Sequence, residues 1–411
     1  MAEKLTIRDI ARLAGVSTTT VSRTLNHKPD VDPETRERIM RIINEHRFIP
    51  NVTASRLAGG KSHLLGAFVP SLTWPLMPYI LQGIAEVIEQ TAYELVLYSL
   101  SHRTDRSALI DRILATGLID GLIAIYPDGI APVESSPDVM DREASGHLLQ
   151  VYQQGFPVVV LDDQSLPGQI PWVGPDNRIG AYEATRHLIA LGHRRIAHIQ
   201  GPAVYQCSYD RALGYRQALE EADIPLESAL ITPGDFTTPG GYAAAERLLS
   251  AADRPTAIFA ANDQMAYGVL EAARTHGIRV PEKLAVIGFD DIVPLAPVRP
   301  ALTTVRQPFQ EMGRQAAETL LALSQAPHTF DGGWYDQVTQ APPTRPHTTP
   351  TKPIQQQLPT ELVVRESSGV RLQQTPSQRQ PSKSARPAKP VASAEHLAPA
   401  EQLTSAEPMA D

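Results

Sequence analysis

The chain has 411 residues, of which 42% are hydrophobic, and its formal net charge is -8. This length exceeds one ordinary core and suffices for two or three domains. No window approaches the roughly 18 consecutive apolar residues that a membrane helix needs, and the charged start lacks the apolar core of a signal peptide. We therefore expect a multidomain cytoplasmic protein with no membrane partner.

The charge is unevenly distributed along the chain. Residues 1–61 contain 11 Lys and Arg against 7 Asp and Glu, a balance of +4, whereas the remainder carries -12. A small basic head on a large acidic body indicates that only the head contacts an anionic polymer.

The segment LTIRDIARLAGVSTTTVSRTLN in the head is typical of two short helices joined by a tight turn. Thr6 and Asp9 have the spacing of a capping box, and Gly15 stops the first helix. Apolar residues three and four positions apart give this helix a face that can be buried. They are Ile7, Ile10, Ala11 and Ala14.

The second helix is expected over residues 18–25, with Ser17 as its N-cap, which leaves the short joint of a helix-turn-helix. Its outward side carries short hydrogen-bonding groups and, one turn later, Arg23, as a recognition helix presents to base edges. A third helix is indicated by the capping residue Asp32 and by Pro33 at its first position. From the pattern alone, a generic three-helix bundle with a solvated polar face is the alternative.

The motif T-x-x-D-I-A-x-x-A-G-V-S-x-x-T-V-S-R-x-L-N, followed by F-I-P-N, resembles the head of the lactose-repressor/galactose-repressor (LacI/GalR) family of bacterial transcription factors. The resemblance implies that Thr18, Thr19 and Arg23 read bases in the major groove. Because Thr18 and Thr19 are short, the operator sequence does not follow from them. The resemblance also implies phosphate contacts or helix support from Thr6, Ser17, Thr20, Ser22 and Asn26.

The segment NVTASRLAGG, residues 51–60, has helix-forming content but is too short to hold a helix alone. Asn51 can cap a short helix, Ala54 and Leu57 lie three residues apart on one face, and Arg56 adds a charge that attracts phosphate. In the family that the chain resembles, this hinge helix enters the minor groove, where Leu57 would be the apolar wedge between base steps. We expect it to fold when two copies meet on the operator; a plain flexible linker is the alternative.

Strand-like apolar runs alternate with amphipathic helical stretches after residue 61. This rhythm predicts parallel sheets with helices on both faces, and the length fits two lobes. The predicted fold is α/β: a three-helix helix-turn-helix DNA-binding head and a hinge helix, joined to a two-lobed body like a periplasmic binding protein. The strand-like runs are LLGAFVP, ELVLYSL, GLIAIYP, PVVVLDD, RRIAHIQG, TAIFAAND and KLAVIGFDD.

We predict the domain boundaries from these patterns. The DNA-binding domain covers residues 1–50, the hinge 51–61, the ligand-binding and dimerisation domain 62–368, and a disordered tail 369–411. The body divides into an N-lobe of residues 62–162 and 292–325, a C-lobe of residues 163–291 and 358–368, and a disordered Pro-rich insertion of residues 326–357. The stretch 127–150 is longer than in the family and is expected at the cleft rim, and the tail lacks the heptads of a coiled coil.

Polar residues follow several of the predicted strands, where open α/β sheets bind their ligands. Asp162 follows PVVVL, Asn262 follows AIFAA, and Asp290 follows AVIGF. Each alone is better explained as a turn former or a helix cap. Together with Arg211, a planar fork of donors, they favour a polar ligand cleft.

The body motifs GHRRIAHIQGP, RALGYRQAL, AANDQMAYGVL, VIGFDD and LTTVRQPFQEMG resemble the same family, so the similarity spans roughly residues 5–325 and resumes at LPTELVVRESS. A carboxylate, a guanidinium and an aromatic face suit a sugar, and a purine is the rival ligand. Ile125 is apolar where a sugar-binding relative can carry an amide, which changes the hydroxyl pattern recognised. The resemblance implies polar ligand contacts from Asp162, Arg211, Asn262, Asp290 and Gln307, an aromatic wall from Phe236, and apolar lining from Trp74 and Phe309.

No catalytic constellation is visible, since HExxH, GxSxG and phosphate-loop motifs are missing from the sequence. The single cysteine, Cys207, excludes an intramolecular disulfide and a cysteine-rich metal site, and we expect it to be buried. We predict a protein without enzymatic activity, cofactor or metal: a homodimeric repressor whose affinity for a pseudo-palindromic operator responds to a small ligand. A solute-binding protein and a sugar- or nucleoside-processing enzyme are the alternatives.

The substitution Leu57→Ala tests the hinge. Removing the wedge should weaken specific operator binding on the order of tenfold, because kinked DNA is then less well stabilised. Ligand binding should be unchanged. Anisotropy titrations with operator DNA measure the first effect and calorimetry the second; unaltered operator affinity would contradict the role of the hinge.

Overall fold

The computed structural model describes residues 5–25, 28–46, 48, 61–100, 106–125, 143–162, 169–294, 298–325 and 353–369. The predicted hinge up to residue 60, most of the Pro-rich insertion and the tail beyond residue 369 lie outside these ranges. Within them, no helix is both long and apolar enough to span a bilayer.

The head contains the predicted helix-turn-helix and a third helix: α1 (Ile7–Ala14), α2 (Thr18–Leu25) and α3 (Pro33–Glu45). The backbone N–H and hydroxyl of Thr6 both donate to Asp9, at 2.9 and 2.7 Å. Gly15 ends α1 with a φ of 66°, in the left-handed region that glycine adopts without strain. Asp32 caps α3 by accepting from the Thr35 backbone N–H at 3.0 Å. The predicted helix starts and stops are therefore confirmed.

The three helices of the head enclose one small core. Ile10, Val21 and Ile39 are completely buried there, one from each helix. Because the apolar side of α2 is used in this core, its other side is left to solvent. The packing thus fixes which residues of α2 face outward.

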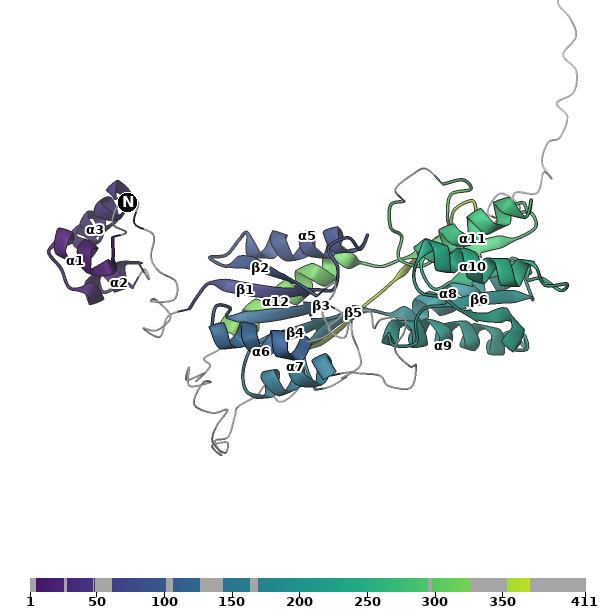
Figure 1. The fold of residues 1–411 in the computed structure, drawn as a ribbon, viewed down its shortest axis with the longest axis horizontal. Helices are drawn as coiled ribbons and strands as arrows, with labels where there is room; N and C mark the ends of the chain where they lie inside the picture. The colour runs from purple at the N-terminus through teal and green to yellow at the C-terminus, as the bar shows by residue number, and fades with distance from the viewer. Residues whose placement is uncertain are drawn as a thin grey trace, which may run out of the picture. The chain divides into compact units, whose positions relative to one another are not determined.

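The first lobe is built on a six-stranded parallel sheet with the order β11-β5-β4-β3-β1-β2. Two helices cover one face and two cover the other, as Figure 1 and the two separate hydrophobic clusters show. The strands are β1 (Leu64–Val69), β2 (Glu94–Ser99), β3 (Gly121–Ile125), β4 (Val158–Leu161), β5 (Trp172–Pro175) and β11 (Gln355–Leu358). The helices are α5 (Met77–Ile88) and α12 (Phe309–Gln325) on one face, and α6 (Arg106–Thr116) and α7 (Glu143–Gln153) on the other.

The second lobe has a four-stranded parallel sheet, order β7-β6-β8-β9, and a separate antiparallel pair of β10 and β12. Its hydrophobic clusters again lie on both sheet faces, one under α8 and α9 and one under α10 and α11. The strands are β6 (Ile196–Gln200), β7 (Ile231–Pro233), β8 (Ala257–Ala260), β9 (Ala285–Ile287), β10 (Thr304–Arg306) and β12 (Glu361–Val363), and the 3₁₀ helix η1 covers Ser228–Leu230. The helices are α8 (Asn177–Ala190), α9 (Gln206–Glu221), α10 (Thr238–Leu249) and α11 (Asp263–Thr275).

The predicted lobe boundaries need three corrections. β5 belongs to the first sheet, so the first lobe continues past residue 162 to Pro175. Val305 lies in the core of the second lobe, so β10 belongs to that lobe, although Ile292 contacts the hydrophobic cluster of the first lobe and α12 begins there at Phe309. Residues 355–357, predicted to lie in a disordered insertion, form β11 at the edge of the first sheet.

Helices α5 and α12 approach each other closely at two glycines. A Cβ at Gly83 would lie 1.8 Å from the carbonyl oxygen of Gln310, and one at Gly313 would lie 2.1 Å from that of Ile80. Both obstructing atoms belong to backbone, so a side chain at either position would push the helices apart. This contact holds α12 against the first lobe.

The substitution Gly83→Ala should lower the free energy of unfolding by about 1–3 kcal/mol, because it overpacks a helix contact that cannot relax locally. Gly146→Ala is the matched control: it lies within α7 with open space around its Cβ position. The control should raise stability by up to about 1 kcal/mol through helix propensity. Urea denaturation measures both; equal effects of the two substitutions would refute the close contact.

Candidate functional site

The outward side of α2 carries the predicted base-reading residues. Thr18, Thr19 and Arg23 are all exposed. Ser17 Oγ accepts from the backbone N–H of Thr20 at 3.1 Å and lies 2.9 Å from the Thr20 hydroxyl. Ser17 and Thr20 thus support the start of the helix, which leaves Thr18 and Thr19 free to project from its N-terminal end.

Arg23 is ion-paired with Asp30, a residue that no sequence pattern marked. Arg23 Nη2 lies 2.6 Å from Asp30 Oδ2, and both side chains are about half exposed. Ser22, beside Arg23, is half buried. The remaining predicted DNA contacts lie outside the described residues: Asn26, Asn51, Ala54, Arg56 and Leu57.

Arg211 lies at the centre of a polar network in the second lobe. It projects from α9 and is only 3% exposed. Its Nε donates to Asn177 Oδ1 at 2.9 Å and its Nη1 to the carbonyl oxygen of Ala261 at 2.5 Å, while Asp290 Oδ1 lies 3.7 Å from Nη1. The guanidinium is stacked 3.9 Å from the centre of the Phe289 ring. A buried guanidinium held on all sides in this way is a fixed donor group.

Asp290 and Gln307 form the next part of the network. Gln307 Nε2 donates to Asp290 Oδ1 at 2.6 Å, and both residues are buried. The backbone N–H of Asp290 donates to the Val305 carbonyl at 2.7 Å, which places β10 beside the end of β9. Gln307 Oε1 is buried without a hydrogen-bond partner among the described residues. A ligand that donates a hydrogen bond would satisfy this acceptor.

Asn262 joins the network to the aromatic wall. Its Nδ2 donates to the carbonyl oxygen of Phe236 at 3.0 Å, and its Oδ1 caps α11 by accepting from the backbone N–H of Met265 at 3.0 Å. The Phe236 ring lies 5.9 Å from the Arg211 guanidinium and 5.7 Å from the ring of Tyr205. The structure therefore brings together five of the predicted ligand residues: Arg211, Phe236, Asn262, Asp290 and Gln307.

The other three predicted ligand residues lie in or beside the first lobe. Asp162 is buried at the end of β4, where its φ of 59° turns the chain, and its backbone N–H donates to the Val173 carbonyl at 2.8 Å. Phe309 is buried in the hydrophobic cluster of α5 and α12, against which Trp74 packs. The same cluster includes Cys207, so it reaches the first turn of α9.

Cys207 is buried, as predicted, and lies within the electrostatic reach of several charges. Burial raises the pKa of its thiol to about 12, and Asp162 and Asp290 act in the same direction, against Arg211. Asp162, Arg211 and Asp290 thus all act on the pKa of the Cys207 thiol at the start of α9.

The carboxyl group of Asp290 has a raised pKa. Burial raises the pKa of Asp290 to about 6, although the Arg211 charge and the Gln307 hydrogen bond lower it. Burial and the Asp290 charge also raise the pKa of Asp263 well above its ordinary value. Asp263 accepts from Thr304 Oγ1 at 2.5 Å and from the Ile292 backbone N–H at 2.9 Å. Its carboxylate therefore links the start of α11 to Ile292, in the loop after β9, and to Thr304 in β10.

Two network residues were missed in the sequence: Asn177 and Phe289. Asn177 follows β5, whose short sequence WVGP gave no strand signal. Phe289 directly precedes the predicted Asp290, and an aromatic residue within a strand-like run gave no signal of its own. Among the described residues, no group of three His, Cys, Asp or Glu side chains is arranged to hold a metal ion.

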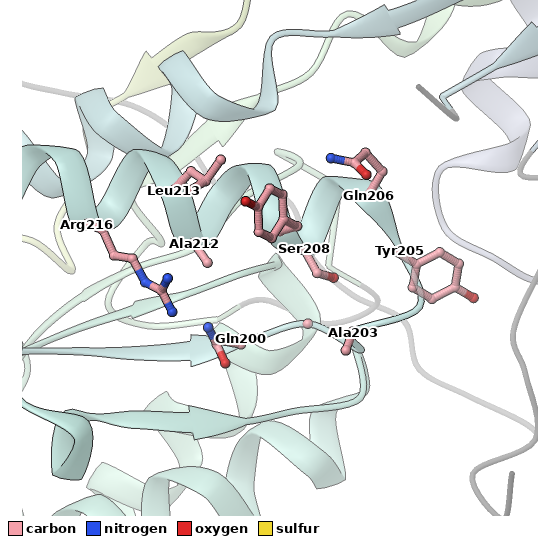
Figure 2. Close-up of a pocket in the computed structure, with 10 residues that line it drawn as sticks. Gln200, Ala203, Tyr205, Gln206, Ser208, Ala212, Leu213 and Arg216 are labelled. Carbon is pink, nitrogen blue, oxygen red and sulfur yellow. The ribbon is translucent and has the colours of Figure 1, made fainter. Parts of the chain in front are cut away.

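A pocket of about 470 Å³ lies between α9 and the end of β6 (Figure 2). None of the predicted ligand residues lines it, although Tyr205 joins its wall to Phe236. The pocket adjoins the network but is separate from it. Its lining residues are Gln200, Gly201, Ala203, Tyr205, Gln206, Ser208, Tyr209, Ala212, Leu213 and Arg216.

A helix-turn-helix head with an exposed recognition face, joined to a two-sheet α/β body with polar strand ends, defines a DNA-binding protein with a binding-protein-like domain. The chain matches the family models "Bacterial regulatory proteins, lacI family" over residues 6–51 and "Periplasmic binding protein-like domain" over residues 185–368. It is 34% identical over 318 residues to the HTH-type transcriptional regulator DegA of Bacillus subtilis (strain 168), covering 77% of this chain and 90% of DegA. The chain belongs to the LacI family and is a DNA-binding transcriptional regulator.

Solved structures agree with this assignment. The lac repressor dimer bound to operator and the anti-inducer ONPF has a TM-score of 0.71 and 28% identity, over 89% of this chain and 99% of that one. The complex of the transcriptional regulator CelR with cellobiose has a TM-score of 0.59 and 30% identity, over 88% and 99%. The predicted family and fold class are therefore confirmed.

The raised pKa of Asp290 predicts how stability depends on pH. Between about pH 4 and pH 6 the folded protein retains a proton that the unfolded chain has lost, so the stabilising effect of this group is lost as pH rises through that range. The substitution Asp290→Asn removes this titration, and it also removes the part of the raised Asp263 pKa that the Asp290 charge causes. The unfolding free energy of wild type relative to the variant should fall by about 2 kcal/mol between pH 4 and pH 7. Denaturant titrations at several pH values measure it; a difference that stays constant or grows would contradict the prediction.

Proposed function

We propose that this protein is a homodimeric repressor whose affinity for a pseudo-palindromic operator is controlled by a small ligand held between the two lobes. The observation that carries this proposal is the buried network around Arg211, assembled at strand ends of a chain that also has a recognition helix. Such a network serves a ligand in the body, and the exposed side of α2 serves DNA. The protein would then act in the cytoplasm, at operator sites of the nucleoid.

On the DNA side, Thr18, Thr19 and Arg23 are proposed to read base edges in the major groove. Their exposure supports this role, because the buried side of α2 is used in the core of the head. The segment 51–60 is proposed as the hinge helix, with contacts in the minor groove from Asn51, Ala54, Arg56 and Leu57. The lac repressor dimer, bound to operator, is similar to this chain along almost its whole length.

On the ligand side, a sugar or sugar derivative fits the network best. Arg211 offers donors, Asp290 offers a carboxylate, and Gln307 Oε1 is an acceptor without a partner among the described residues. Adjacent hydroxyls, which both donate and accept, suit this combination, and the Phe236 ring suits the C–H face of a sugar. CelR, a structural relative, was solved with cellobiose. A purine is the second candidate, because Phe236 also offers a surface for stacking.

The point where the hinge joins the body supports control of DNA binding by the ligand. Lys61 Nζ donates to the carbonyl oxygen of Ser324, near the C-terminal end of α12, at 2.6 Å. The backbone N–H groups of Ser62 and His63 donate to Asp120, at 3.0 and 2.8 Å. We propose that ligand changes the lobe arrangement, and that this anchored junction transmits the change to the two hinges. Coupling of about 1–3 kcal/mol is the usual scale for such control.

The two alternative classes have less support. A solute-binding protein would share the body but has no use for the head. An enzyme would need a positioned acid, base or nucleophile; Asp290 and Asp263 are instead bonded to neighbouring side chains and backbone groups. Ligand turnover by the purified protein would nevertheless refute the assignment as a repressor.

The test is a thermal-shift screen of sugars and nucleobases, followed by operator binding with each hit. Arg211→Lys should weaken the binding of a hit by about tenfold or more, because an ammonium cannot replace the planar fork. Arg186→Lys is the matched control, since Arg186 is exposed on α8 and pairs with Glu183. Operator binding without ligand should remain in both variants. If no compound shifts melting, or if Arg211→Lys and the control bind the hit equally, the proposed site is wrong.

A further inference from the structure

We propose that Asp30 is a positioning residue for DNA recognition: its carboxylate holds the Arg23 guanidinium in the orientation that reads a base. This inference rests on the proposed role of Arg23. The ion pair joins the last turn of α2 to the loop before α3, with 2.6 Å between Arg23 Nη2 and Asp30 Oδ2. Asp30 is seven positions after Arg23 and lies outside α2, so the contact is made by the fold of the loop and not by helical spacing.

Residues 28–32, the described part of the loop that carries Asp30, are bonded to α2 and α3. The backbone N–H of Lys28 donates to the carbonyl oxygen of Arg23 at 3.0 Å, and Arg36 on α3 donates to the carbonyl oxygen of Lys28. On the other side of Asp30, Val31 is buried at 7% exposure and Asp32 caps α3. Asp30 is therefore an acceptor at a fixed position beside a long and otherwise mobile side chain.

Stability does not explain this ion pair. Half-exposed ion pairs contribute little to the free energy of folding, so the fold gains little from it. An acidic group beside the recognition helix is also unfavourable for binding a polyanion, because it opposes the basic charge of the head. Neither stability nor general DNA attraction accounts for Asp30, whereas its contact with Arg23 can orient the guanidinium.

The remaining donors of Arg23 explain how both contacts fit together. A guanidinium has five N–H groups in a planar fork, and Asp30 takes a donor of Nη2. Among the described residues Arg23 has no further ion pair beyond Asp30, so the other donors can make a bidentate contact with the two acceptors of guanine in the major groove. The bond to Asp30 restricts rotation of the guanidinium, so its other N–H groups point toward the base in one fixed plane. Asp30 therefore increases discrimination between bases at the cost of general affinity.

The experiment uses the full-length protein and an operator obtained by selection from random DNA. Arg23→Ala first identifies the base pair that Arg23 reads, as the position where discrimination between the four bases is lost. Asp30→Asn and Asp30→Glu are then compared at that position and at the others, over a range of salt concentrations. Glu37→Gln is the matched control: it removes the same charge from the head, where Glu37 lies 4.0 Å from Arg41 on exposed α3.

We expect Asp30→Asn to reduce discrimination at the Arg23 position by roughly three- to tenfold, with other positions unchanged. Asp30→Glu should restore part of it. Glu37→Gln should raise affinity for all sequences alike and leave discrimination intact. Thermal melting of each variant confirms that the head is folded.

Three results would overturn the proposal. Equal discrimination in Asp30→Asn and Glu37→Gln would show that the pair is a surface contact without a role in recognition. Increased discrimination in Asp30→Asn would show that Asp30 sequesters Arg23 and must release it on DNA. If Arg23→Ala leaves base discrimination unchanged at every operator position, the proposed role of Arg23 is wrong, and the role of Asp30 is then wrong too. Failure to select any operator contradicts the proposed function as a whole.

Discussion

Burial of the Arg211 charge is the constraint on which the second lobe and its candidate site depend. Removing a guanidinium from water costs several kcal/mol unless hydrogen bonds and an opposite charge replace the water. Here the replacements come from α8, from the end of β8 and from the end of β9, through Asn177, Ala261 and Asp290. These elements must therefore keep their relative positions for the charge to be tolerated. The fold and the candidate ligand site are consequently stabilised by the same contacts.

Helix α12 connects this site with the start of the hinge. Gln307, which bonds to Asp290, lies two residues before α12, and Ser324, which accepts from Lys61, lies in its last turn. The helix has 17 residues, which spans about 25 Å at 1.5 Å per residue. Its close glycine contact with α5 ties it to the first lobe, so under the proposed control a change at Gln307 would act on that lobe through α12. A rigid helix of this kind suits the proposed coupling better than a chain of flexible side chains.

The fold was predictable where burial leaves a strong apolar signal. All five residues of β3, GLIAI, are buried, and this run was recognised from its sequence. β11 reads QQQL and lies at a sheet edge with alternating exposure, so its pattern resembles a polar linker, and the pairing with β5 that defines it is a long-range contact. The same limit applies to the site. Arg211 and Asp290 were marked by motif and strand end, whereas Asn177 and the pairing of Arg23 with Asp30 depend on how distant or irregular segments meet.

Asn262 shows why residue type alone does not decide between a structural and a ligand-binding role. Its Oδ1 caps α11, which is the structural role of a polar residue at a strand end, and its Nδ2 donates to the Phe236 carbonyl. Few hydrogen-bonding positions of this side chain therefore remain for a ligand. Gln307 differs, because its Oε1 is buried and unpaired within the described part of the chain. An unpaired buried acceptor is costly, so a ligand that donates to it gains more than one that contacts a satisfied group. Discrimination between ligands should therefore depend on Gln307 more than on Asn262.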